Sequence, residues 1–211
     1  MPPEGAYGKV VSMATAIAPA RTRGQGTTAQ RILDVAERLV QLRGFNGFSY
    51  ADIAAELGIT NASLHYHFPS KAALGEALIR RYATRFAAAL ASIDRSVPDA
   101  RAKLDAYVGL YADVLKGRRM CLCGILAAEY ETLAPPMREA VIRFFDDNEA
   151  WLATVLEQGR ADGTLALHET AAATAQLILS GLEGAMLVAR PYDDLARFTM
   201  AATRLIASLT A

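Results

Sequence analysis

Residues 50–68 read YADIAAELGITNASLHYHF, and this stretch decides the fold. Two short helices are predicted, joined by a tight turn at Gly58, where glycine permits a left-handed backbone. Ala54 is small enough to let the two helices cross closely. Apolar side chains on both sides of the turn supply a shared core, namely Ile53, Leu57, Ile59 and Leu64. This is the pattern of a helix-turn-helix, whose second helix enters the major groove of DNA.

Two of the chain's three histidines, His65 and His67, lie in the second helix. Side chains two positions apart on a helix point in roughly opposite directions, so the pair is poorly placed to bind a metal or to form a catalytic dyad. A solvated helix face and a nucleic-acid surface remain as interpretations. Ser63 and Tyr66 favour the second, because such groups contact phosphates and base edges. Leu64 and Phe68, four residues apart, share the inward face of the helix.

The chain beyond residue 26 reads as successive helices. Capping residues mark several starts, such as Thr27 with Gln30 and Ser49 with Asp52. No alternating strand pattern of useful length is present, so we expect an all-α fold of about nine helices. They are predicted at 27–44, 50–57, 62–68, 71–91, 98–116, 121–133, 137–163, 170–190 and 193–209.

Composition and charge limit the class of protein. The 211 residues are 53% apolar, and the formal net charge is zero. Residues 1–90 carry an excess of four positive charges and residues 91–211 an excess of four negative charges, a weak indication that the first part has a polyanionic partner. Two cysteines form no disulfide framework and indicate a reducing compartment. No apolar run approaches the ~18 residues of a membrane span, and no cofactor is expected.

Residues 28–78 resemble the DNA-binding region of the tetracycline-repressor (TetR/AcrR) family. The resemblance rests on the pattern F-x-x-x-x-I-A-x-x-L-G-I-x-x-x-x-L-x-x-H-F-x-S-K-x-x-L. Residues 1–26 carry Pro, Gly, Ala and Arg without periodicity and predict a disordered N-terminal arm, in which Met13 is a possible true start and Arg21 and Arg23 are basic. A helix-turn-helix domain would follow over 27–75. A ligand-binding and dimerisation domain would occupy 76–211.

The resemblance also implies which residues meet DNA. The groove-entering turn corresponds to Thr60, Asn61, Ala62 and Ser63. His65, Tyr66 and His67 match positions that touch the DNA backbone or bases, although many relatives have tyrosine where His65 stands. Ser49 and Tyr50 match the start of the supporting helix, which abuts the backbone. Lys71 matches the family's phosphate-contacting lysine, and a phosphate would offset the cost of a cation in the first turn of a helix.

The sequence of the second domain says less about function than that of the first. The resemblance implies an apolar pocket between the middle helices. The candidate lining residues are Tyr107, Tyr111, Ile125, Tyr130, Phe145 and Trp151, although a residue of this kind more often belongs to an ordinary core. Cys121 and Cys123 are interpreted first as buried small side chains. The alternative is an electrophile-sensing repressor acting through Cys121, with a thiol pKa lowered by Arg118, Arg119 and a helix N-terminus.

The last two predicted helices, 170–190 and 193–209, are too apolar to be solvated. Small residues allow close helix approach along the first of them, at Ala173, Ser180, Gly181, Gly184 and Ala185. The resemblance implies that these two helices pair with a second subunit. We therefore expect a cytoplasmic homodimeric repressor that binds operator DNA and a small-molecule effector. An enzyme or a protein-binding helical module are the alternatives from other classes.

Overall fold

The computed structural model describes residues 26–209. Over that range the chain forms nine α-helices, two short 3-10 helices and no strand, which confirms the all-α prediction. The predicted arm at 1–26, with Met13, Arg21 and Arg23, lies outside the described residues except for Gly26. The α-helices are α2 Thr28–Arg43, α3 Tyr50–Leu57, α4 Asn61–His67, α5 Lys71–Ser96, α6 Ala100–Lys116, α7 Leu122–Ala128, α8 Pro135–Ala161, α9 Ala171–Ala189 and α10 Leu195–Leu209.

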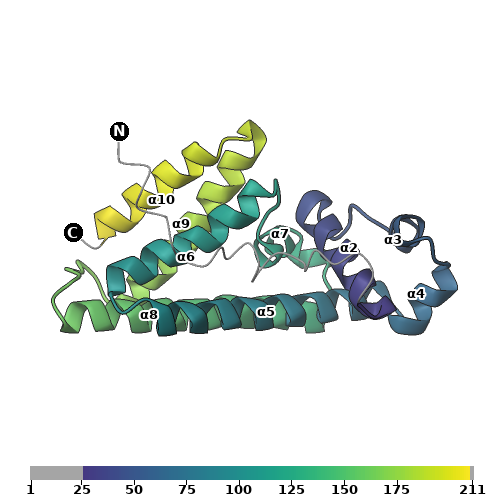
Figure 1. Cartoon of the computed structure of the whole chain (residues 1–211), viewed down its shortest axis with the longest axis horizontal. Helices are drawn as coiled ribbons and strands as arrows, with labels where there is room; N and C mark the ends of the chain where they lie inside the picture. The colour runs from purple at the N-terminus through teal and green to yellow at the C-terminus, as the bar shows by residue number, and fades with distance from the viewer. Residues whose placement is uncertain (1–25, 210–211) are drawn as a thin grey trace.

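Helices α2, α3 and α4 form a small head at one end of the molecule (Figure 1). Their packing follows the predicted pattern, since Ile53 and Leu64 are 0% exposed and Phe68 is also buried. Phe45 and Phe48, in the loop between α2 and α3, complete this core with an edge-to-face ring contact. Three helices of this length therefore enclose a core of their own.

Helices α5 and α8 are the longest, and they lie side by side along the molecule (Figure 1). Helix α5 starts in the head and runs unbroken past residue 75, where the sequence predicted a domain boundary. Gly75 lets it approach α8 closely, because a Cβ there would lie 2.4 Å from the terminal methyl of Met137. One continuous helix thus joins the head to the C-terminal bundle.

A buried ion-pair cluster fixes the head onto α5. Glu37 of α2 is 0% exposed, and its two carboxylate oxygens bind Arg81 and Arg85 of α5. Arg81 also bridges to Asp34 at 2.7 Å. Both arginine side chains are about one-fifth exposed. The Glu37 carboxylate is therefore neutralised inside a contact between α2 and α5 that excludes most of the solvent.

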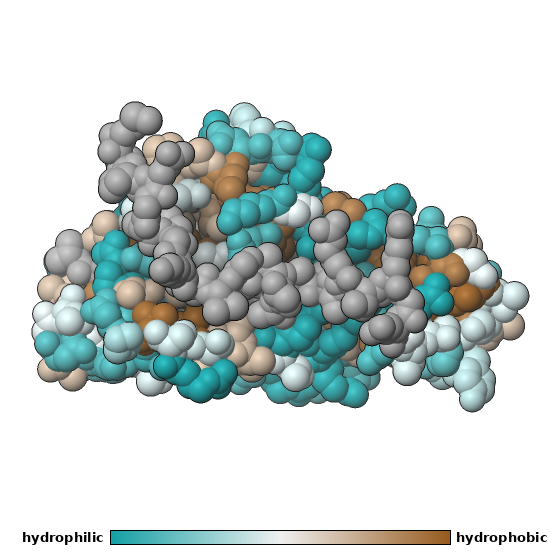
Figure 2. All heavy atoms as spheres, in the orientation of Figure 1, coloured by the Kyte–Doolittle hydropathy of each residue, from teal (hydrophilic) through white to brown (hydrophobic). Residues whose placement is uncertain are grey.

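Helices α9 and α10 pack against each other and, through α9, against α8. Along α9 one face is open, with exposed apolar side chains at Leu177, Leu187 and Val188, and Met200 is exposed on α10. Figure 2 shows brown apolar atoms in the upper part of the molecule, where α9 and α10 lie in Figure 1. Contrary to our expectation, the segment Ala171–Tyr192 is long and apolar enough to cross a membrane by length and composition alone. Its packing is that of a helix in a bundle.

Several predicted boundaries were wrong, and helices α6 and α10 begin at Ala100 and Leu195, two residues later than predicted. Helix α5 continues to Ser96, where Ala91 was expected, because Ile93 still packs into the core. The single helix predicted over 121–133 is α7 followed by the 3-10 helix η1, Tyr130–Thr132. Helix α8 begins at Pro135, since proline is tolerated in a first turn that needs no N–H donor.

Candidate nucleic-acid interface and effector core

The turn between α3 and α4 has the geometry that the sequence predicted. Gly58 adopts φ 65° and ψ 36°, and no heavy atom lies within 4 Å of a Cβ built on it, so glycine is needed there for its backbone and not for space. Ser49 and Asp52 form a capping box at the start of α3, and Thr60 caps α4 by accepting the Ser63 N–H at 3.2 Å. The hydrogen bonds from Ser49 lower the pKa of Asp52. Both helix starts are therefore held in place locally.

Helix α4 presents a polar and aromatic outer surface. Tyr66 is 85% exposed, the highest value among the large hydrophobic side chains described. We define the recognition face as the exposed residues of α4 and its cap, namely Thr60, Asn61, Ala62, His65 and Tyr66. Ser63 and His67, also predicted to meet DNA, are only partly exposed. The buried Leu64 and Phe68 hold the opposite side of α4 on the head.

The two histidines contact different neighbours, as their spacing predicts. The His65 ring lies 4.9 Å from the Tyr50 ring and its Nδ1 is 3.3 Å from the Pro69 carbonyl oxygen, whereas His67 packs edge-on to Tyr66. Within residues 26–209, no three His, Cys, Asp or Glu side chains are grouped so that they could hold a metal ion. The pair is therefore part of a surface.

Two of the predicted DNA contacts are engaged inside the head. The Tyr50 hydroxyl donates to the Phe68 carbonyl at 2.9 Å and so ties the start of α3 to the end of α4. Lys71 donates to the Phe48 carbonyl and lies over the rings of Phe45 and Phe48. Desolvation lowers its pKa, against the attraction of Glu129 and Asp52. Ser49, by contrast, is exposed. Lys71 thus braces the loop between α2 and α3 from inside the head.

The C-terminal bundle contains a continuous group of aromatic side chains from α5, α6 and α8. Each ring in it lies within 6.2 Å of another, centroid to centroid. We call this group the aromatic cluster; its members are Tyr82, Phe86, Tyr107, Tyr111, Phe144, Phe145 and Trp151. The Tyr107 hydroxyl lies 3.2 Å from that of Tyr111 and donates to Asn148 at 3.1 Å.

Four of the predicted pocket residues meet in the aromatic cluster: Tyr107, Tyr111, Phe145 and Trp151. Tyr107 and Tyr111 are 0% and 2% exposed, so they pack as core in this conformation. Ile125 lies partly buried on α7, and Tyr130 lies in η1 under the Arg138 guanidinium. Sequence reasoning missed Tyr82, Phe86, Phe144 and Asn148. The spacing of Tyr82 and Phe86, four residues apart on α5, was the available signal.

The cysteine alternative is not supported by the structure. Cys121 and Cys123 are 1% and 0% exposed, and burial raises the pKa of both thiols. The expected activating cations are engaged elsewhere, since Arg118 pairs with Asp193 and Arg119 hydrogen-bonds to the Gln41 side chain. An electrophile sensor needs an accessible, low-pKa thiol. The first interpretation, two buried small side chains, is the one that the structure bears out.

Glu183 is a functional candidate that sequence reasoning missed. It is the one charged residue of α9, between Ala171 and Ala189, and this isolation within an apolar helix was a readable signal. Its Oε1 atom is buried without a hydrogen-bond partner, and its carboxyl lies against Gly124 and the Cys121 thiol. Desolvation raises the pKa of Glu183 to about 7, against a smaller lowering by the Cys121 hydrogen bond.

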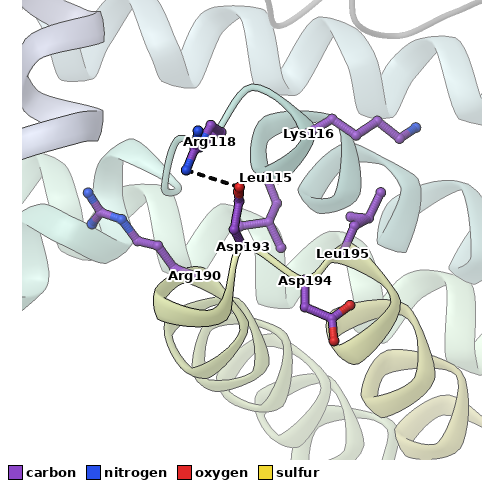
Figure 3. Close-up of a pocket in the computed structure, with 7 residues that line it drawn as sticks. All are labelled: Leu115, Lys116, Arg118, Arg190, Asp193, Asp194 and Leu195. Atoms are coloured by element: carbon purple, nitrogen blue, oxygen red, sulfur yellow. Dashed lines mark ion pairs between the residues drawn. The ribbon is translucent and has the colours of Figure 1, made fainter.

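A surface hollow of about 390 Å³ lies where the end of α6 meets the start of α10 (Figure 3). Its walls carry charges of both signs, and Arg118 and Asp193 bridge it at 3.0 Å while remaining mostly exposed. None of the predicted lining residues belongs to it. An exposed ion pair contributes little binding energy, and the hollow has few apolar side chains on its walls.

Helix α7 connects the aromatic cluster to the head. At its N-terminal end, Cys121 accepts the Tyr82 hydroxyl at 3.7 Å and contacts Glu183. At its C-terminal end, the Glu129 carboxylate accepts the Phe45 N–H at 2.5 Å and the Asn46 N–H at 3.3 Å, in the loop between α2 and α3. One short helix therefore contacts both regions with hydrogen-bonding side chains.

Comparison with known proteins identifies relatives over most of the chain. Residues 32–78 match the family model described as bacterial regulatory proteins of the tetR family. Residues 100–205, half of the chain, match the model of a tetracyclin repressor-like C-terminal domain.

Solved structures and a curated protein agree with these matches. A TetR-family transcriptional regulator from Agrobacterium tumefaciens is 36% identical, with a TM-score of 0.84 over 87% of this chain and 97% of that one. A TetR regulator from Legionella pneumophila is 33% identical, with a TM-score of 0.78 over 89% and 100%. The HTH-type transcriptional repressor KstR2 of Rhodococcus jostii is 28% identical over 68% of this chain and 70% of its own length.

Proposed function

The chain belongs to the TetR family of bacterial regulatory proteins, and from this premise we propose that it is a repressor released from its operator by a small organic effector. It is a DNA-binding transcriptional regulator and not an enzyme. Release by an effector, the residues that read DNA and the dimer surface are our proposals. A relative described as a transcriptional repressor supports repression over activation. The cytoplasm is the compartment in which such a regulator meets the chromosome.

The recognition face is the surface that we assign to the major groove. The observation that carries this assignment is the 85% exposure of Tyr66 on a helix whose other side is buried in the head core. Tyr66 keeps most of its ring in water although His67 packs edge-on to it, and base edges and sugars can cover that ring. Thr60, Asn61 and His65 add hydrogen-bonding groups on the same face. Tyr50 is assigned a bracing role for α4, and Lys71 a bracing role for the loop between α2 and α3.

A homodimer through α9 and α10 accounts for the open face of α9. Leu177, Leu187 and Val188 are 49%, 61% and 54% exposed, and no heavy atom lies within 4 Å of a Cβ built on Gly184, which lies between them in sequence. A second copy related by a two-fold axis would cover this face. Its recognition helix would then lie about 34–36 Å from the first, one turn of DNA.

The coupling between effector and DNA is assigned to α7. Effector binding in the bundle displaces rings of the aromatic cluster, and Tyr82 contacts Cys121 at the start of α7. At the other end of the helix, Glu129 holds two backbone N–H groups of the loop that precedes α3. A shift of α7 therefore changes the orientation of the head relative to the bundle. In a dimer this changes the distance between the two α4 helices. Such a coupling requires the effector to bind the two arrangements with different affinity.

Selection of sites from a random DNA pool tests the proposed function. We expect enrichment of a palindrome whose half-sites are one helical turn apart. The affinity for that site should fall steeply with salt, by about 0.9 in log affinity per log salt unit for each phosphate contacted. The genes next to the site would indicate the effector. An unenriched pool, or binding that is independent of salt, would show that the fold is used for a protein partner instead.

A further inference from the structure

We propose that the effector carries an organic ammonium group, protonated or quaternary, and that the Glu183 carboxylate binds it with the aromatic cluster as the wall of the site. This inference rests on the proposed function, because it names the chemistry of the molecule that the C-terminal domain binds.

The first observation is an acid without a counter-charge. Glu183 has a carboxylate oxygen, Oε1, that is buried and accepts no hydrogen bond. A buried carboxylate oxygen is costly unless it is paired, and the fully buried Glu37 is paired with Arg81 and Arg85. Among residues 26–209, no Lys or Arg makes an ion pair with Glu183, so a cation is what this site lacks in the free protein.

The second observation is the absence of a side chain beside this acid. A Cβ built on Gly124 of α7 would lie 2.2 Å from Glu183 Oε2, so a larger residue there would displace the carboxyl. Gly124 has ordinary backbone angles, since it is not among the glycines with positive φ. Its role is therefore spatial, and it keeps the carboxyl at the contact between α7 and α9.

The third observation is the aromatic wall. The Tyr82 hydroxyl donates to the Cys121 thiol at 3.7 Å, and Cys121 contacts Glu183. Burial chiefly raises the pKa of Tyr82, Tyr107 and Tyr111, and the charge of Glu183 adds a smaller increase. The carboxyl is therefore linked to the aromatic cluster through the Cys121 thiol and the Tyr82 hydroxyl. Ring faces attract cations, and a carboxylate combined with aromatic faces is suited to ammonium ions. A neutral apolar effector would leave the acid unpaired.

The charge state of the site fixes how binding depends on pH. The titratable groups around Glu183 are Cys121, Cys123 and the three tyrosines, and burial raises the pKa of each, so all are neutral at pH 7. Glu183 itself has a pKa of about 7. A cation binds only the ionised form, so its affinity should fall by about tenfold per pH unit below that value.

The test measures ligand binding without DNA, by calorimetry on the full-length protein. The probes are benzyltrimethylammonium, hexyltrimethylammonium and hexylammonium, each beside the alcohol with the same hydrocarbon group. We expect at least one cation to bind about tenfold more tightly than its alcohol, the size of one charge-assisted interaction. That preference should disappear in Glu183→Gln, which keeps the shape of the side chain. The control Glu157→Gln removes an exposed acid from α8 and should keep the preference.

Two results would overturn the inference: no cation preferred over its alcohol, or a preference that persists in Glu183→Gln. Affinity that stays constant from about pH 5.5 to pH 8 would also contradict it. These outcomes are distinct from failure of the proposed function, which is judged on DNA. A protein that binds ammonium ions through Glu183 without binding any DNA site would uphold the inference on ligand chemistry and refute the repressor.

Discussion

The head and the C-terminal bundle each place a glutamate carboxylate between helices, and the chain treats the two in opposite ways. Glu37, at the contact of α2 with α5, is matched by two arginines. Glu183, at the contact of α9 with α7, has a thiol and a glycine beside it and a carboxylate oxygen without a partner. A paired buried acid fixes one arrangement of helices, whereas an unpaired one leaves a site with unsatisfied binding capacity. The difference separates a region built for rigidity from a region built to respond.

The largest expected effect is at the paired acid. Glu37→Gln leaves Arg81 and Arg85 without their carboxylate, in a contact where each is only about one-fifth exposed. Breaking a buried pair on one side costs about 3 kcal/mol of unfolding free energy when the remaining charges keep some solvent. Urea denaturation measures this loss, which should be accompanied by weaker DNA binding. A loss close to zero would mean that Glu37 does not clamp the head.

Replacing the unpaired acid, Glu183, should raise the unfolding free energy, and the size of this gain should depend on pH. Because burial raises the pKa of Glu183 from 4.5 to about 7, the folded protein retains a proton that the unfolded chain has lost between those pH values. Unfolding free energy therefore falls as pH rises through this window, by about 3 kcal/mol at most. Glu183→Gln removes this loss, so it should be more stable than the parent at about pH 8 and similar to it at about pH 5. Equal stabilities at both pH values would argue against an ionisable, unpaired Glu183.

Two glycine substitutions in the bundle should change stability by smaller amounts, and only one of them lies beside Glu183. Gly124→Ala introduces a Cβ 2.2 Å from Glu183 Oε2 and should cost about 1–3 kcal/mol, as overpacking does. Gly109→Ala, on α6, meets no heavy atom within 4 Å and should gain up to about 1 kcal/mol of helix propensity. Thermal unfolding of the two variants distinguishes them. If both were stabilising, the Glu183 carboxyl would have freedom to move away from α7.

The sequence predicted the head better than the bundle, for physical reasons. Caps, the turn glycine and the inward Leu64 and Phe68 are local features, and each was confirmed. The Lys71 ammonium binds the carbonyl oxygen of Phe48, which lies 23 residues away in sequence. The residues next to Lys71 in the sequence do not indicate such a contact. A lysine with a free ammonium and one that braces a loop have the same sequence context.

In the bundle, the determining contacts join distant segments. The alternative of a reactive Cys121 rested on Arg118 and Arg119, which precede it, but these arginines bind Asp193 and Gln41 instead. Glu183 meets Gly124 across 59 positions of sequence, so only its isolation in an apolar helix could have marked it. The end of α5 at Ser96 was likewise set by the burial of Ile93 against the other bundle helices, which propensity alone does not specify.

The most direct test of the account is the DNA affinity of Tyr66→Ala beside that of Tyr192→Ala. Both tyrosines are exposed, at 85% and 62%, but only Tyr66 belongs to the recognition face. Fluorescence anisotropy on the selected operator should show about a tenfold loss for Tyr66→Ala, the size of one good base-edge or stacking contact, and no change for Tyr192→Ala. Equal affinities for the parent and both variants would contradict the assignment of α4 to the major groove.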